Sequence, residues 1–149
     1  MAPTLVYRAP MRSRRDDVDH GAAVERALAL GLCGVGGRLE GRPRDAADAV
    51  AMTDAAHGER VARRLERFQG LPDGTVVWTR TPDGRYARGT LTGPWRHAPD
   101  PAAYDLDLVH VRPCAWDEPV EEHRVPAAVV ATYRRGGRNL QRVRGAEED

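Results

Sequence analysis

Apolar and polar positions alternate in the middle of the chain in a pattern typical of a β-hairpin. Residues 75–80 and 86–92 carry β-branched or aromatic side chains at alternate positions, and Thr-Pro-Asp-Gly at 81–84 supplies a turn between them. Residues 107–112 are predicted as a third strand. Because proline cannot donate to a strand ladder, Gly93-Pro94 ends the second strand, and we expect Trp95 to lie on a corner of the sheet.

Helical spacing dominates the N-terminal part of the chain. Asp19 is a suitable N-cap for a helix over residues 20–30, and Gly31 is a natural stop. Two further helical pieces are predicted over residues 45–52 and 55–68, with a weak joint in the region of Thr53-Asp54 and Gly58. The glycine-rich run at 32–37 lacks the order of a dinucleotide-binding loop, so a buried strand or turn is expected there.

The two ends of the chain complete the predicted architecture. Short strands are expected over residues 5–7 and 139–143, and a helix begins at Val125-Pro126 and stops at Gly136-Gly137. The pattern predicts one α+β domain over residues 1–149 with a curled, mainly antiparallel sheet and flanking helices. Its parts are a helical half over 1–67, a β-rich part over 68–144 and a frayed acidic tail over 145–149.

Composition limits the chemistry that this chain performs. The net charge of +1 neither requires nor excludes a polyanionic partner. All 23 basic residues are arginine, which is typical of a GC-rich coding bias, and the absence of lysine excludes mechanisms that need one. Cys33 and Cys114 stand alone, and no stretch has the length of a signal peptide or membrane span, so a reduced, cytoplasmic protein is predicted.

No set of residues has the spacing of a known catalytic or metal site. His97, His110 and His123 lie about a dozen residues apart, unlike a compact zinc ligand pair. Cys33 and Ser13, the only serine, lie outside any nucleophile motif. We therefore expect no metal, no cofactor and no catalytic residues.

Aromatic rings gather between residues 74 and 116, a stretch that holds all three tryptophans. Bases stack on exposed aromatic faces with about 1–3 kcal/mol each, whereas the alternative is that these rings fill the core of the sheet. The predicted ligand-binding cage consists of Trp78, Tyr86, Trp95, Trp116 and His97.

Arginines lie among these rings and in a second group near the C-terminus. The segment 133–144 holds five arginines and no acidic residue, which favours contacts with phosphates, although a basic edge strand is the simpler alternative. The predicted phosphate-binding residues are Arg88, Arg96, Arg134, Arg135, Arg138 and Arg142.

The order of short motifs over residues 68–144 resembles the EVE-type branch of the PUA superfamily. These motifs are Gly74, Val76, Trp78, Asp83-Gly84, Tyr86, Gly89, Leu91, Gly93-Pro94-Trp95, His110-Val111-Arg112, Trp116, Val125-Pro126 and the run from Arg135 to Arg142. The resemblance implies a curled barrel in which an aromatic cage holds a flipped, modified base of the methylated-cytosine type. It also implies modified DNA, rather than RNA, as partner, and a separately encoded nuclease where such modules serve restriction and defence. The N-terminal Tyr-Trp signature of the best-known solo EVE proteins is absent.

The sequence therefore favours a non-catalytic reader of modified nucleic acid. Two alternatives stay open. One is a small enzyme that acts on a nucleoside-like ligand, with His97 or His110 as acid and base and an aspartate as partner. The other is a subunit that uses the aromatic surface to bind another protein.

Overall fold

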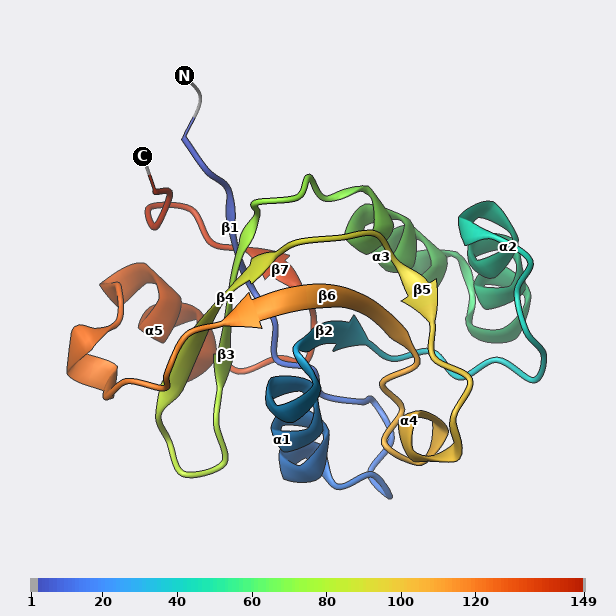
Figure 1. Cartoon of the computed structure of the whole chain (residues 1–149), viewed down its shortest axis with the longest axis horizontal. Coiled ribbons are helices and arrows are strands. Elements are labelled where there is room, and N and C mark those ends of the chain that lie inside the picture. The colour runs from blue at the N-terminus through green and yellow to red at the C-terminus, as the bar shows by residue number, and fades with distance from the viewer. Residues whose placement is uncertain (1–2, 149) are drawn as a thin grey trace.

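A curled seven-stranded sheet forms the centre of the molecule, and five α-helices surround it (Figure 1). The structure is a computed structural model and describes residues 3–148. The strands are β1 (Val6–Arg8), β2 (Leu32–Val35), β3 (Val76–Arg80), β4 (Tyr86–Leu91), β5 (Arg96–His97), β6 (His110–Trp116) and β7 (Gln141–Arg142). The helices are α1 (His20–Leu30), α2 (Ala46–His57), α3 (Glu59–Gly70), α4 (Pro101–Asp105) and α5 (Ala127–Arg134), with a 3-10 turn at Glu122–Arg124.

The strand order is β2-β6-β4-β3-β1-β7, and β5 pairs with β6 on the edge opposite β2. All pairs are antiparallel except β1 with β3, so the predicted mainly antiparallel α+β class is confirmed. Strand β6 pairs with β2 and β5 through its first half and with β4 through its last residues. The sheet therefore curls around this one strand into a half-barrel.

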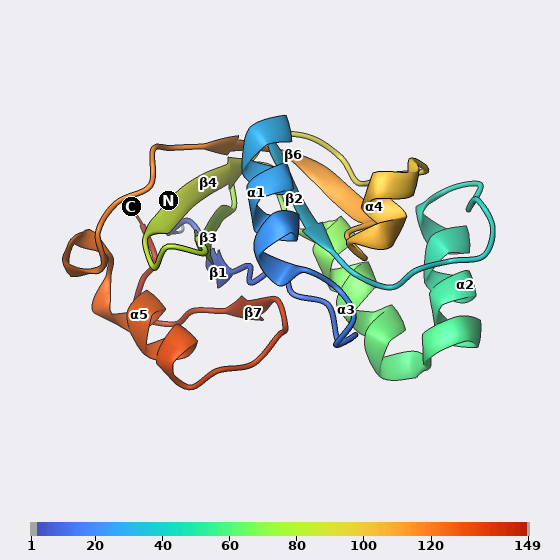
Figure 2. The same cartoon turned by 90° about the horizontal axis from the view of Figure 1, so that it is seen from below.

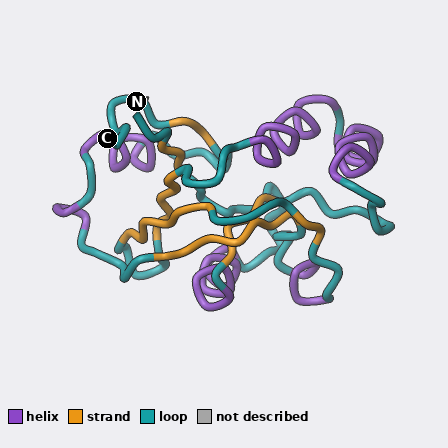
Figure 3. The backbone as a smooth tube through the Cα atoms, turned by 45° about the horizontal axis from the view of Figure 1, so that its top comes forward, coloured by secondary structure: helices purple, strands orange, loops and turns teal. Residues whose placement is uncertain are grey.

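Local signals in the sequence place the helices well. Asp19 caps α1 by accepting a hydrogen bond from the backbone N–H of Ala22 at 3.0 Å, and Gly31 ends it with a left-handed φ of 68°. Gly58, with φ of 95°, separates α2 from α3, whereas Thr53-Asp54, where a break was also expected, lies within α2. Helices α2 and α3 lie together at one end of the sheet and α5 at the other, while α1 and α4 cover a further side (Figures 1, 2 and 3).

The N-terminal half does not form a separate helical layer. It contributes β1 and β2 to the same sheet as the central hairpin, and β1 lies between β3 and β7. At the other end of the chain, where a frayed tail was predicted, Glu148 pairs with Thr4 through backbone hydrogen bonds and its carboxylate accepts from Arg88 at 2.9 Å. Asp149 lies outside the described residues.

Two elements near the third predicted strand differ from expectation. That strand begins at His110 rather than at residue 107, because Asp107 has φ of 49°, which an extended strand cannot contain. The preceding helix α4 was not predicted, although Asp100 as N-cap and Pro101 at the first position are standard helix-start signals. Within residues 3–148, no helix combines the length and apolarity that a membrane crossing requires.

Candidate functional site

The predicted aromatic residues lie in separate parts of the core. Trp78 is 5% exposed, and Tyr86 is buried beside it against α5. The Tyr86 ring meets Tyr133 edge to face at 5.6 Å, and its hydroxyl donates to Glu122 at 3.1 Å. Such contacts are those of a packed cluster between the sheet and α5.

The other predicted rings pack away from the cluster against α5. Trp95 stacks on His110, and His97 lies 5.9 Å from the same imidazole. Trp116 donates its indole N–H to the carbonyl of Leu32 at 2.8 Å and covers Gly89, where an added Cβ would come within 2.6 Å of the indole. These five rings therefore do not surround one space, and none of them lines either cavity described below.

Most of the predicted phosphate-binding arginines are engaged elsewhere. Arg88 pairs with Glu148 and Asp117, Arg134 with Glu122, and Arg142 with Glu147. Arg96 and Arg135 are exposed at positions outside both cavities. Only Arg138 lines a cavity.

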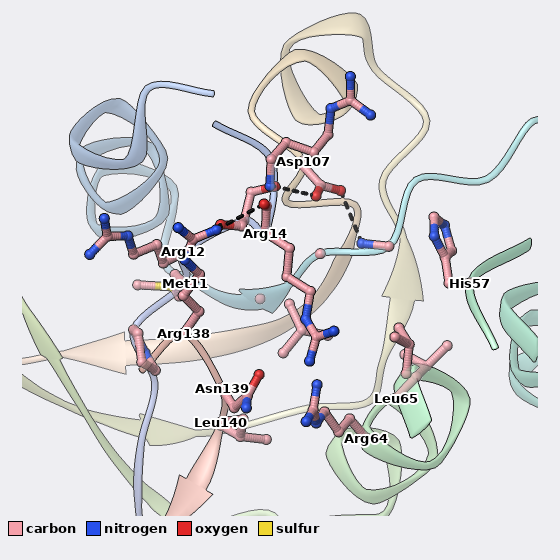
Figure 4. Close-up of a pocket in the computed structure, with 18 of the residues that line it drawn as sticks. Met11, Arg12, Arg14, His57, Arg64, Leu65, Asp107, Arg138, Asn139 and Leu140 are labelled. Atoms are coloured by element: carbon pink, nitrogen blue, oxygen red, sulfur yellow. Dashed lines mark hydrogen bonds between the residues drawn. The ribbon is translucent and has the colours of Figure 1, made fainter. Parts of the chain in front are cut away.

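A cavity of about 210 Å³ lies between the loop after β1, the end of β2, α3 and the segment before β7 (Figure 4). Its apolar wall comes from Ala9, Met11, Val35, Val61, Leu65 and Leu140. The glycines at 34, 36 and 37 bring backbone to the same space, and an added Cβ at Gly36 would lie 2.9 Å from Asp107. Segments far apart in the sequence therefore build one recess.

Two strained backbone positions mark this cavity. Within residues 3–148, Met11 (φ 52°) and Asp107 (φ 49°) are the non-glycine residues with left-handed backbone, and both line it. Such conformations cost about 1–3 kcal/mol and cluster at functional sites. The Asp107 carboxylate is held by Ser13, whose hydroxyl donates at 2.6 Å, and by the N–H of Gly37 at 2.9 Å.

Arginine side chains dominate the charge around the cavity. Six of them line it together with the single carboxylate of Asp107: Arg12, Arg14, Arg15, Arg38, Arg64 and Arg138. Three are held by protein groups. Arg15 pairs with Asp17, Arg38 donates to the carbonyls of Tyr104 and Asp105, and Arg138 donates to the carbonyl of Arg14 at 2.8 Å.

The other three, Arg12, Arg14 and Arg64, make no side-chain hydrogen bond or ion pair with any residue among 3–148. Figure 4 shows the guanidinium groups of Arg14 and Arg64 pointing toward each other. Burial and the nearby charge of Arg14 both lower the pKa of Arg64. Two like charges that face one space without a carboxylate between them favour binding of an anion.

A neutral polar group completes the site. The side-chain amide of Asn139 lines the cavity and makes no hydrogen bond within residues 3–148. Its backbone is fixed by Arg8, which is buried and donates to the carbonyls of Asn139, Gly136 and Thr132 at 3.1, 2.8 and 2.8 Å. The amide therefore offers a donor and an acceptor from a positioned segment.

Sequence reasoning did not find this site. Residues 32–37 were expected as a buried strand or turn and Asp107 as a strand start, whereas residues 34–37 and Asp107 line the cavity. The available signal was the run Arg12-Ser13-Arg14-Arg15 in the loop between a strand and a capped helix. Loops on a rigid scaffold commonly carry binding residues.

The histidines named as acid and base are not among the residues that line the cavity. His110 is fully buried, and burial lowers its pKa to about 4, so the ring is neutral near pH 7. His97 is partly buried, and burial lowers its pKa as well. Among the described residues, no three histidine, cysteine or acidic side chains gather closely enough to hold a metal ion.

Comparisons with known proteins assign this chain to no family. No protein-family model matches the chain, so membership in the EVE branch or the PUA superfamily is not shown. No curated protein matches it either. One solved structure with a similar course is the YTH domain of the Zygosaccharomyces rouxii MRB1 protein in complex with N6-methyladenosine RNA. It has 11% sequence identity and a TM-score of 0.42 over 96% of this chain and 82% of that chain.

Proposed function

We propose that this protein is a non-catalytic nucleic-acid-binding module that accepts one base in the cavity beside Asn139. The observation that carries the proposal is a small recess with an apolar wall, an unpaired amide and three arginines without a carboxylate partner. Apolar walls accept the faces of a base, an amide recognises its edge, and arginines bind phosphate.

The size of the recess favours a single base. A volume of about 210 Å³ is below the roughly 300–1,000 Å³ typical of pockets for larger ligands. A base that leaves its stack loses a few kcal/mol, which contacts in the pocket must offset. Val35, Val61 and Leu65 are available to pack on a ring that enters.

A methyl group on the base would add to these apolar contacts. Burying one methyl-sized group contributes about 0.8 kcal/mol, and the wall carries Met11 and Leu140 for that purpose. We therefore propose a methylated base as the preferred ligand. We take DNA as the strand that carries it, and the binding test compares DNA with RNA.

Phosphate contacts in this proposal come from the rim. Arg12, Arg14 and Arg64 have no carboxylate to release before they bind a strand, unlike Arg88 or Arg142. Their attraction to the backbone is independent of sequence and decreases as salt is added. The cage of tryptophans has no part in this version of the reader function.

A second candidate function rests on Ser13 and Asp107. The serine hydroxyl faces a buried carboxylate at 2.6 Å inside the cavity, and a nucleophile with an adjacent base is the arrangement that covalent catalysis uses. In that case Ser13 would attack the sugar carbon of a nucleoside-like substrate and break its bond to the base, with the hydroxyl proton passing through Asp107 to the departing base. Water would then hydrolyse the sugar–serine bond and restore the hydroxyl. Product formation by the wild type, lost in Ser13→Ala, is the result that would favour this enzyme.

Fluorescence anisotropy with labelled oligonucleotides tests the reader function. The set contains DNA and RNA strands with a central cytosine or adenine, each plain or methylated. The proposal expects tighter binding of one methylated strand, and Asn139→Ala should remove most of that preference. Equal binding of all strands, or a preference unchanged in Asn139→Ala, would contradict it.

Arg63 offers a matched control for Arg64. Both lie on α3 and each carries one charge, but Arg63 is exposed and pairs with Glu59 and Glu66 outside the cavity. Arg64→Ala should weaken binding of all strands, whereas Arg63→Ala should not. Equal losses in both variants would assign the effect to net charge alone.

A further inference from the structure

A second cavity, of about 270 Å³, lies next to the first. Pro10 and Arg12 line both, so the loop after β1 forms the wall between them. The second cavity is also lined by α1, the β3–β4 turn and the end of α5, through His20, Gly21, Val24, Arg80, Thr81, Pro82, Tyr133, Gly136 and Gly137. No aspartate or glutamate is among these lining residues.

Two arginines and one histidine line this space, each from a different element. Arg12 comes from the β1 loop, and Arg80, at the end of β3, lies over the Tyr86 ring at 5.9 Å. Neither forms an ion pair with a carboxylate among residues 3–148. The Nδ1 atom of His20 is buried without a hydrogen-bond partner. The positive charge of this cavity is therefore not balanced by its own walls.

Glycines shape the walls of the second cavity. Gly136 and Gly137 have φ of 79° and 104°, which turns the chain sharply after α5. At Gly21 an added Cβ would lie 3.2 Å from the Pro82 ring, so the glycine lets α1 approach the hairpin turn closely. The recess between these segments has no apolar wall comparable with that of the first cavity.

We infer that the second cavity binds the phosphate and sugar of the nucleotide next to the base held in the first cavity. The strand would cross Arg12, which faces both spaces, and Arg80 would contact the neighbouring phosphodiester. This inference rests on the proposed function, since it assigns the path of the same strand. Sugar and phosphate suit a polar, cationic recess, whereas a base suits the apolar one.

The test compares a mononucleotide with a trinucleotide that carries the same preferred base at its centre. Arg80→Ala should weaken the trinucleotide about tenfold, lower the slope of its salt dependence by about one, and leave the mononucleotide within about twofold. Arg80→Lys should retain most of the affinity. The control is Arg85→Ala on the same hairpin, where the arginine is paired with Asp83 and lies outside both cavities. This variant should bind the mononucleotide and the trinucleotide with unchanged affinity.

The outcomes distinguish a failure of the second site from a failure of the proposed base-binding function. Equal effects of Arg80→Ala and Arg85→Ala on the trinucleotide would overturn the second site, as would equal losses for the two ligands in Arg80→Ala. Failure of the proposed function looks different, because Asn139→Ala and Arg64→Ala would then leave both ligands unaffected. Matching thermal unfolding curves for wild type and Arg80→Ala show that a lost affinity is not lost folding.

Discussion

The indole N–H of Trp95 donates a hydrogen bond to Nδ1 of His110 at 3.2 Å, and the two rings stack with centroids 6.0 Å apart and 25° between their planes. The other imidazole nitrogen, Nε2, lies 3.2 Å from the carbonyl of Gly37 and donates to it. This pair of contacts requires the neutral ring with its proton on Nε2. Because Gly37 lines the first cavity, His110 joins the Trp95 corner to the cavity wall.

Stability should depend on pH through His110. Its pKa is about 4 in the folded protein and about 6.5 when unfolded, so the unfolded chain binds the proton first. The free energy of unfolding therefore holds the full contribution of neutral His110 above pH 6.5. It decreases by up to about 3 kcal/mol as the pH falls toward 4. Urea unfolding at pH 7 and 4.5 measures it. His110→Gln should show a smaller loss over this interval, and an equal loss would contradict the assignment.

Trp95→Ala should reduce the free energy of unfolding by about 3 kcal/mol, the low end for a buried aromatic ring, because Trp95 packs on the main core cluster. Trp95→Phe keeps most of the packing but loses the hydrogen bond to His110, so a loss of about 1 kcal/mol is expected. Denaturant unfolding checks both values. If Trp95→Ala instead leaves stability intact and removes discrimination between bases, Trp95 is a ligand residue as the sequence predicted.

Asp107→Ala should destabilise the protein by about 3 kcal/mol. The variant leaves the buried Ser13 hydroxyl and Gly37 N–H without their acceptor, and it places alanine in a left-handed conformation. Asp107→Asn should cost less, because asparagine tolerates this backbone and keeps one acceptor oxygen. Thermal or urea unfolding compares the two variants. Little or no loss of stability in Asp107→Ala would mean that the carboxylate does not organise the cavity loops.

Arg138 and Arg142 should behave differently although they lie four positions apart. Arg138 lines the first cavity and holds the carbonyls of Ser13 and Arg14, whereas Arg142 pairs with Glu147 away from it. Because Arg138 holds the loop that carries Arg14, Arg138→Ala should weaken strand binding at 0.1 M salt. Arg142→Ala should leave binding within about twofold, as anisotropy would show. Equal effects would favour the whole basic segment as the contact surface, as the sequence first indicated.

Local signals explain why much of the fold was predictable. The Asp19 cap, the Gly31 stop and the turn at 81–84 act within a few residues, so α1 and the β3–β4 hairpin follow directly from the sequence. The parallel pairing of β1 with β3 joins residues 70 positions apart, as in Val6 with Val76, and no local pattern encodes it.

The candidate site was harder to predict for the same reason. Met11, Leu65, Asp107 and Asn139 come from four distant segments that only the complete fold brings together. The tryptophans attracted attention because rings are scarce in this chain, yet Trp78 and Trp116 bury their faces in the sheet. Scarce large residues fill cores first, since each buries much apolar surface.

The most direct test of the central claim is a titration of isotope-labelled protein with the preferred methylated nucleotide, followed by NMR chemical shifts. The account predicts that the side-chain amide of Asn139 and the backbone amides of Gly36 and Gly37 shift in proportion to occupancy, while the Trp78 and Trp116 indole N–H signals stay in place. Shifts confined to the three indole signals, with Asn139 unchanged, would contradict the cavity and restore the aromatic cage.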